Sequence, residues 1–194
     1  LKDKYNKCYN DKAVKAHNKK RALHFFDDEK NELKVDIEAA KVLQKIMDDM
    51  DADPKKVMSE KTLRDIDRTG DYVKKCNVNV HMHTDAVEQH DGDHATEGWY
   101  KNSESYDYVT SKPKLVHDKE DEPTKIKSDT YTQLIWKTST KVGFGIKCGY
   151  ALAWYCPTRP MPKTTVKEYQ ENVCKPDGSC VSPAYLCTRD GYDH

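Results

Sequence analysis

The sequence lacks several features that would place it in a common functional class. No apolar run approaches the ~20 residues that a membrane-spanning helix needs. There is no Cys-x-x-Cys pair with zinc-ligand spacing, no Gly-x-Ser-x-Gly nucleophile motif and no glycine-rich loop for phosphates. Asn-x-Ser/Thr sites are also absent, so we expect no ordinary N-glycosylation. These absences argue against a helical membrane protein, a zinc-finger protein, an α/β-hydrolase and a P-loop protein.

Net charge is missing too, because 33 basic and 33 acidic residues cancel. A general nucleic-acid or anionic-membrane binder would show a basic excess, so we expect neither activity. The charge is nevertheless uneven along the chain. Residues 12–21 are basic, and residues 48–53 and 118–122 are acidic. We interpret these segments as solvated faces.

Apolar residues are scarce for a folded protein. The 194 residues suit a single domain, but only 36% are hydrophobic while 34% are charged. Tyrosine, tryptophan and cysteine are spread along the chain, which argues against disorder. The composition predicts a thin core under a heavily charged surface.

The seven cysteines predict disulfide bonds in a secreted protein, because they cluster toward the C-terminus without metal-ligand spacing. The number is odd, so one thiol is free or pairs outside the chain. The spacing does not determine which cysteines pair. The chain begins at Leu1 without a signal-like apolar stretch, which we interpret as a mature secreted product whose leader has been removed. The disulfide candidates are Cys8, Cys76, Cys148, Cys156, Cys174, Cys180 and Cys187.

Apolar periodicity predicts helices in the first half of the chain. Residues 10–24 carry alanines and leucine at near-helical spacing, and residues 36–50 form a broad apolar stripe. Residues 53–54 are expected to open a short turn, and residues 59–70 a further short helix that stops at glycine. Residues 94–108 show a weaker helical pattern, interrupted by one glycine.

The remaining segments read as strands and loops. Residues 78–81 alternate like a strand or an extended loop. Residues 111–129 are polar and proline-containing, which predicts a long surface loop. Residues 142–147 and 150–155 predict a hairpin around Cys148-Gly149. From residue 157 onward there is no periodicity, so we expect a disulfide-stapled tail packed on the main body.

Four landmarks in order resemble the CAP superfamily (cysteine-rich secretory proteins, antigen 5 and pathogenesis-related proteins). They are His-Asn-x-x-Arg at residues 17–21, Trp-Tyr at 99–100, Tyr-Thr-Gln-Leu-Ile-Trp at 131–136, and the apolar run between cysteines at 148–157. Each is weak alone, but four landmarks in the family order make coincidence improbable.

The resemblance implies an α+β fold, a three-layer α-β-α sandwich (the CAP domain) around a short antiparallel sheet. It implies that residues 131–136 form a short helix or turn, although their propensity alone favours a strand. Residues 1–157 would form the CAP domain, and residues 158–194 a cysteine-rich C-terminal extension packed on it.

The tail at residues 169–180 is similar to the cysteine-rich ends of nematode venom-allergen-like (activation-associated secreted) proteins. Hookworm members of that group antagonise host integrins on platelets and neutrophils. The resemblance therefore implies a secreted, extracellular parasite effector that inhibits blood-cell adhesion. Several CAP proteins carry sterols or fatty acids, so lipid binding is the alternative function.

Many CAP proteins hold a zinc or similar ion in a cleft with two histidines and two glutamates. The resemblance puts one histidine position at Thr130 and the two glutamate positions at Asn102 and Val78, while the other histidine has no counterpart. Threonine and valine cannot replace a metal ligand or a general base. We therefore expect no cofactor, no cleft metal and no enzyme built on one.

Three other segments are candidate sites. His81 and His83, followed by further histidines and carboxylates up to residue 94, could chelate zinc or copper, although a histidine-rich surface loop is the simpler interpretation. Two further segments are candidate protein contacts. One resembles the integrin-binding Arg-Gly-Asp tripeptide, although its glycine also suits a helix stop, and the other is a turn between two cysteines. They comprise Arg68, Gly70 and Asp71, and Lys175, Pro176, Asp177 and Gly178.

Overall fold

The structure, a computed structural model, describes most of the chain. Described are residues 5–25, 29–49, 76–82, 92–117, 119, 121–147, 150–157 and 164–176. The turn and helix expected at 53–54 and 59–70, and the hairpin turn at 148–149, lie outside these residues. None of the described helices is both long and apolar enough to cross a membrane.

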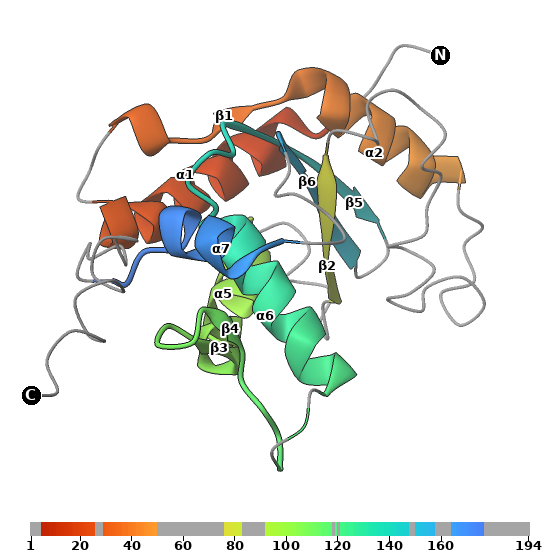
Figure 1. The fold of residues 1–194 in the computed structure, drawn as a ribbon. Coiled ribbons are helices and arrows are strands. Elements are labelled where there is room, and N and C mark those ends of the chain that lie inside the picture. The colour runs from red at the N-terminus through yellow and green to blue at the C-terminus, as the bar shows by residue number, and fades with distance from the viewer. Residues whose placement is uncertain are drawn as a thin grey trace, which may run out of the picture.

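A four-stranded sheet forms the centre of the molecule, in the order β1-β5-β6-β2 (Figure 1). The strands are β1 (Lys34–Val35), β2 (Asn77–Met82), β5 (Lys141–Lys147) and β6 (Tyr150–Cys156). The expected pairing of β5 with β6 and the expected strand near residues 78–81, which is β2, are confirmed. β6 pairs antiparallel with both β5 and β2. The two-residue β1 was not predicted, and it pairs parallel to β5.

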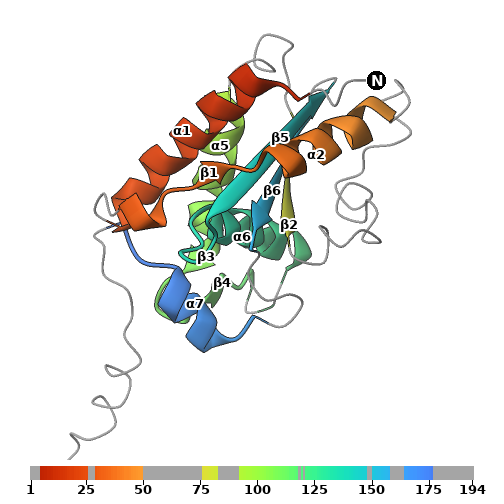
Figure 2. The same cartoon turned by 90° about the horizontal axis from the view of Figure 1, so that it is seen from above.

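Helices cover both faces of this sheet, which confirms the three-layer α-β-α sandwich (Figure 2). The helix α2 (Ile37–Asp49) lies on one face, where Leu43 and Met47 pack with Trp154. The Asp36 carboxylate caps it by accepting from the Ala39 amide. A Cβ at Gly143 would lie 2.5 Å from the Ala40 nitrogen, so glycine allows this close approach.

The opposite face of the sheet carries a larger core. It is built from α1 (Lys7–Phe25), α5 (Gly92–Lys101) and α6 (Glu122–Leu134). Large buried aromatic side chains fill the space between these helices and the sheet, among them Tyr9, Trp99, Tyr131, Trp136, Phe144 and Tyr155. Large aromatic rings therefore supply much of the buried surface of this core.

Two sequence-based predictions were wrong in this half of the fold. The helical pattern at 94–108 ends at residue 101 and gives way to the 3-10 helix η4 (Asn102–Ser105) and strand β3 (Tyr106–Asp107). The surface loop expected at 111–129 contains β4 (Lys112–Pro113) and the first half of α6. Asp121 caps that helix by accepting from the Thr124 amide, with proline in the first turn. The implied helix at 131–136 is confirmed, because residues 131–134 form the last turn of α6.

The segment at 164–176 forms a helix that the sequence interpretation missed, α7 (Val166–Asn172). A capping box starts this helix: the Thr165 hydroxyl accepts from the Glu168 amide, and the Glu168 carboxylate accepts from the Thr165 amide. Tyr169 packs its ring against Trp136 at 5.7 Å between centroids. The described part of the tail therefore lies on the main body.

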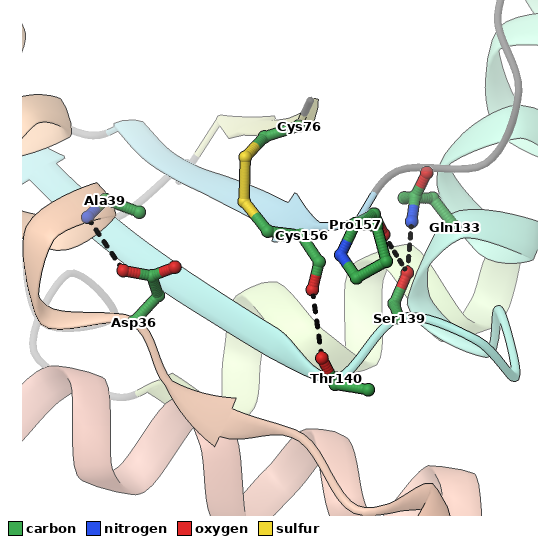
Figure 3. Close-up of a disulfide and its surroundings, with 8 residues drawn as sticks. All are labelled: Asp36, Ala39, Cys76, Gln133, Ser139, Thr140, Cys156 and Pro157. Atoms are coloured by element: carbon green, nitrogen blue, oxygen red, sulfur yellow. Dashed lines mark hydrogen bonds between the residues drawn. A yellow bond between two sulfur atoms is a disulfide. The ribbon is translucent and has the colours of Figure 1, made fainter. Parts of the chain in front are cut away.

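The described cysteines follow the disulfide prediction in part. Cys76 and Cys156 form a disulfide between the ends of β2 and β6 (Figure 3). Cys174 is also disulfide-bonded. Cys8 was a disulfide candidate and is instead a free, exposed thiol, which fits the odd cysteine count. The candidates Cys148, Cys180 and Cys187 lie outside the described residues.

Candidate functional site

Two of the three positions that the resemblance assigns to metal ligands meet in the structure. Asn102 lies where α5 passes into η4, and Thr130 lies in α6. The Asn102 side-chain amide donates to the Thr130 hydroxyl at 2.8 Å, and this hydroxyl donates to the Lys127 carbonyl at 2.8 Å. Val78 lies apart from them, because its side chain packs in the core on the α2 face.

This pair does not fit a metal ion. Its side chains are a neutral amide and an alcohol that satisfy each other, whereas a borderline metal prefers imidazole, thiolate or carboxylate. Thr130 is buried, so its hydroxyl cannot turn to another partner without losing both hydrogen bonds. The described part of the chain contains no group of three or more His, Cys, Asp or Glu side chains able to hold a metal. At two of the positions that the resemblance assigns to ligands, the structure therefore has a hydrogen bond between neutral side chains.

A buried chain of hydrogen bonds leads from Thr130 to α1. The Asn79 amide donates to the Thr130 carbonyl at 2.8 Å and lies 3.3 Å from the Tyr155 hydroxyl. The Tyr155 hydroxyl lies 2.7 Å from His17 Nε2, and His17 Nδ1 lies 2.8 Å from the Ala13 carbonyl. A carbonyl can only accept, so Nδ1 carries the proton and Nε2 accepts from the tyrosine.

His17 is therefore a neutral structural residue. Burial lowers its pKa to about 3, because the protonated ring would lose its hydration. Burial likewise raises the pKa of Tyr155. Both shifts favour the neutral forms, so His17 and Tyr155 keep these hydrogen bonds at neutral pH.

Arg21 stabilises the segment that carries the strongest family resemblance. It is fully buried, and its guanidinium donates to the backbone carbonyls of residues 31, 134, 136, 137 and 139. Burial lowers its pKa to about 10, which leaves it charged at neutral pH. The carbonyls at the C-terminal end of α6 carry partial negative charge and stabilise the cation. The His-Asn-x-x-Arg motif thus fixes the architecture.

A second polar group joins α6 to the end of β6, next to the disulfide (Figure 3). The Gln133 amide donates to the Ser139 hydroxyl at 3.1 Å, and this hydroxyl donates to the Pro157 carbonyl at 2.9 Å. Asn77 donates to the Gln133 oxygen at 3.3 Å. The Ser139 hydroxyl is thus engaged as a structural link.

The structure describes only part of the candidate protein contacts. Lys175 is half-buried and Pro176 is exposed, directly after the buried Cys174. The Cys174 carbonyl accepts from His24 Nδ1 at 2.7 Å. This hydrogen bond fixes the backbone directly before Lys175 and Pro176. Burial lowers the pKa of His24. The candidates Asp177 and Gly178, and likewise Arg68, Gly70 and Asp71, lie outside the described residues.

His81, the first histidine of the proposed metal pair, packs against α5. Its ring lies 5.6 Å from the His94 ring and 6.1 Å from the Trp99 ring between centroids. It also covers Gly98, where a Cβ would lie 2.4 Å from the imidazole. His83 lies outside the described residues. The structure therefore brings His81 together with His94.

The sequence interpretation missed the polar face of β2. Asn77 and Asn79 alternate with Val78 and Val80, and the two asparagines point toward α6 while the valines pack under α2. This alternation is visible in the sequence and could have identified Asn79 as a buried link between strand and helix.

Comparisons with known proteins agree with this fold. The family model described as CAP, the cysteine-rich secretory protein family, matches residues 14–157. Venom allergen-like protein 4 of Schistosoma mansoni is similar in structure, with a TM-score of 0.53, 15% identity, and coverage of 89% of this chain and 98% of that chain. Na-ASP-1 has a TM-score of 0.52 and 12% identity, covering 91% of this chain and 44% of that chain. Among curated proteins, no match to the sequence is found.

Proposed function

The chain belongs to the CAP family of cysteine-rich secretory proteins, and we propose that it is a secreted, non-enzymatic effector that binds and blocks a host protein. CAP proteins are typically secreted. The target class that we favour is an integrin-type adhesion receptor on blood cells, because the tail resembles those of hookworm integrin antagonists. Binding at such a receptor would inhibit platelet or leukocyte adhesion.

The observation that carries this proposal is the Asn102–Thr130 hydrogen bond. In a CAP fold, metal-dependent chemistry would need ligands at these positions, and here their side chains satisfy each other at 2.8 Å. The histidine nearest to this pair along the hydrogen bonds, His17, keeps its pKa near 3 and cannot serve as a base. A scaffold in which Asn102, Thr130 and His17 are engaged in structural hydrogen bonds is suited to displaying a surface.

The proposed mechanism is steric occupation of the receptor by loops and by the tail. A binding surface gains affinity when its segments are already ordered, because less conformational entropy is lost on association. The described tail meets this condition, since Val173 and Cys174 are buried and α7 packs on the core. Within the extension at 158–194, we propose Lys175 and Pro176, followed by Asp177 and Gly178, as part of the contact surface.

Lipid transport is the alternative. The groove between α1 and residues 32–35 has a volume of about 500 Å³, large enough for a small ligand. Half of its lining residues are charged, namely Asp11, Lys15, Lys19 and Glu32. An acyl chain or sterol would gain little there, because a lipid site needs an apolar lining.

The test is binding of the purified protein to resting and activated platelets and leukocytes, with integrin-blocking antibodies as competitors. Saturable binding that the antibodies abolish supports the receptor hypothesis and justifies mapping residues 68–71 and 174–180. If neither cell type binds the protein, the hypothesis is wrong. Extraction of the native protein followed by mass spectrometry then tests for bound sterol or fatty acid.

A further inference from the structure

The outward face of α1 carries a row of lysines. Lys12, Lys15 and Lys19 are spaced by three and four residues, which places them on one side of the helix about 10 Å from end to end at ~1.5 Å per residue. All three are exposed, while the opposite side of α1 packs in the core through Ala13, His17 and other residues. The row therefore points into solvent along about two helical turns.

These lysines differ from their neighbours in having no acidic partner. Lys7 is paired with Asp11 at 2.5 Å, and Lys20 with Glu97 at 2.7 Å. Within the described part of the chain, no carboxylate lies within 4.0 Å of Lys12, Lys15 or Lys19. In a protein with zero net charge, an uncompensated row of like charges is a local concentration of positive potential.

A groove runs along the row on its β1 side. Lys15 and Lys19 form one wall and Glu32 and Val35 the other, with Asn18 at the helix side. Asp11 also lines the groove, but its charge is compensated by Lys7. Glu32 is therefore the one uncompensated carboxylate in the lining of this groove. The Asn18 amide donates to the Leu33 carbonyl at 3.0 Å and accepts from the Leu33 amide at 2.8 Å, so it holds the wall of the groove in place. Lys15 and Lys19 thus face the groove with one uncompensated opposing charge.

We propose that this face of α1 binds a linear sulfated polysaccharide of the glycosaminoglycan type. A straight row of three ammonium groups matches a straight chain of sulfates, and lysine binds such anions as a point charge. The inference rests on the proposed function in that a secreted effector meets these polysaccharides at the host cell surface. They would hold the protein close to its receptor.

Two other polyanions fit this face less well. A single-stranded nucleic acid needs aromatic side chains on which its bases stack, and the face between Lys12 and Lys19 has none. A membrane-surface helix needs an apolar face directed at the lipid, and on this outward face Leu23 is the one exposed large hydrophobic residue of α1. A row of lysines that has neither aromatic side chains for stacking nor an apolar face for lipid favours a hydrophilic polyanion such as a sulfated polysaccharide.

The binding test uses a size-defined heparin oligosaccharide and titration calorimetry across a range of salt concentrations. The variant K12E/K15E/K19E is compared with K101E/K125E/K127E, which changes the net charge equally on α5 and α6. We expect the first variant to lose at least tenfold in affinity and the control less than threefold. For nucleic acids, each neutralised anion contributes ~0.7–0.9 to the slope of log K against log salt, so the first variant should lose a slope of about 2–3. Glu32→Gln should strengthen binding.

Cys8 supplies a readout local to this face. It is an exposed free thiol one helical turn before Lys12. Bound oligosaccharide should slow its alkylation by neutral iodoacetamide in the unaltered protein and leave the rate unchanged in K12E/K15E/K19E. Equal loss of affinity in both triple variants, absence of protection at Cys8, or tighter binding to DNA or to phosphatidylserine vesicles would overturn the proposal.

Enzymatic removal of cell-surface glycosaminoglycans separates this inference from the receptor hypothesis. If antibody-sensitive binding to platelets persists on stripped cells while heparin does not bind, the polysaccharide proposal fails and the receptor hypothesis stands. If heparin binds through the lysine row and the antibodies have no effect on cell binding, the receptor hypothesis fails alone.

Discussion

Asn102 of η4 donates a hydrogen bond of 2.8 Å to Thr130 of α6, and both are positions that the resemblance assigns to metal ligands. The pair links η4 to α6, and the Thr130 hydroxyl in turn donates to the Lys127 carbonyl at 2.8 Å. The two side chains that meet here are neutral and satisfy each other. The consequences concern both metal binding and stability.

The unaltered protein should bind no zinc at Asn102 and Thr130. Titration calorimetry should detect no saturable heat that depends on these residues, and Asn102→Ala should leave any weak background unchanged. The variant N102E/T130H introduces a carboxylate and an imidazole and should gain measurable affinity. A strong signal from the unaltered protein that N102A abolishes would contradict this prediction.

Thr130→Val should destabilise the fold. It keeps the shape of the side chain but removes the acceptor for Asn102 in a buried site. Leaving one buried partner unsatisfied costs about 1–3 kcal/mol, measured as the free energy of unfolding in urea. The matched double variant N102L/T130V removes both partners and should recover part of this loss.

Stability should fall as the pH is lowered from neutral. The pKa of His17 is about 3 in the folded protein and near 6.5 when unfolded, so the unfolded state takes up the proton first. The contribution of neutral His17 is fully present above pH 6.5. It declines by about 1.4 kcal/mol per pH unit as the pH falls toward 3. His24, whose pKa is also lowered, adds to the effect.

Denaturation at several pH values measures this slope. His17→Gln should be less stable at pH 7 and should show a shallower loss of stability between pH 6 and 4. The variant Leu115→Ala, at an exposed residue that does not titrate, serves as control and should keep the slope of the unaltered protein. An unchanged slope in the His17 variant would show that another group is responsible.

Arg21→Met should be among the most damaging single substitutions. Methionine fills similar space but removes the guanidinium donor from the carbonyls of residues 134, 136 and 139, of which the residue 136 carbonyl keeps the Ser139 amide as a donor. Each buried carbonyl that is left without a donor costs about 1–3 kcal/mol, so their sum is large against a typical domain stability of ~5–15 kcal/mol. Lys20→Met, at the neighbouring ion pair whose Glu97 side is exposed, should cost about 1 kcal/mol or less.

The Cys76–Cys156 disulfide should contribute substantially to stability. It closes a loop with a sequence separation of 80 residues, for which the chain-entropy relation gives about 4.5 kcal/mol. The variant C76A/C156A should lower the free energy of unfolding by up to that amount. Cys8→Ala, which removes a free exposed thiol, should have no effect.

Local patterns predicted the elements whose sequence periodicity matches their burial. The apolar stripe at 36–50 gave α2 within one residue at each end, because its buried side is continuous. The surface loop predicted at residues 111–129 was wrong because the first turns of α6 face solvent and are highly charged. Their charge hides the helical pattern that begins at the Asp121 cap. The Thr165–Glu168 capping box was present in the sequence but stood among residues without apolar periodicity.

The site was predictable only where a family motif marked it. The positions 102 and 130 were identified as missing ligands from the resemblance, and the structure adds that they bond to each other. The contacts of Arg21 with residues 134–139 join segments more than a hundred residues apart, and no local pattern encodes them. The basic segment at 12–21 was interpreted as a solvated face, and in the structure only its lysine row faces solvent. His17 and Arg21 of the same segment are buried.

The most direct measurement is cell binding by protein that has been stripped of metal with a chelator and then freed of the chelator. We predict saturable binding to activated platelets or leukocytes, equal to that of untreated protein and abolished by integrin-blocking antibodies. Absence of saturable binding, or binding that is lost on stripping and restored by zinc, would contradict a CAP protein that acts through its surface without a cleft metal.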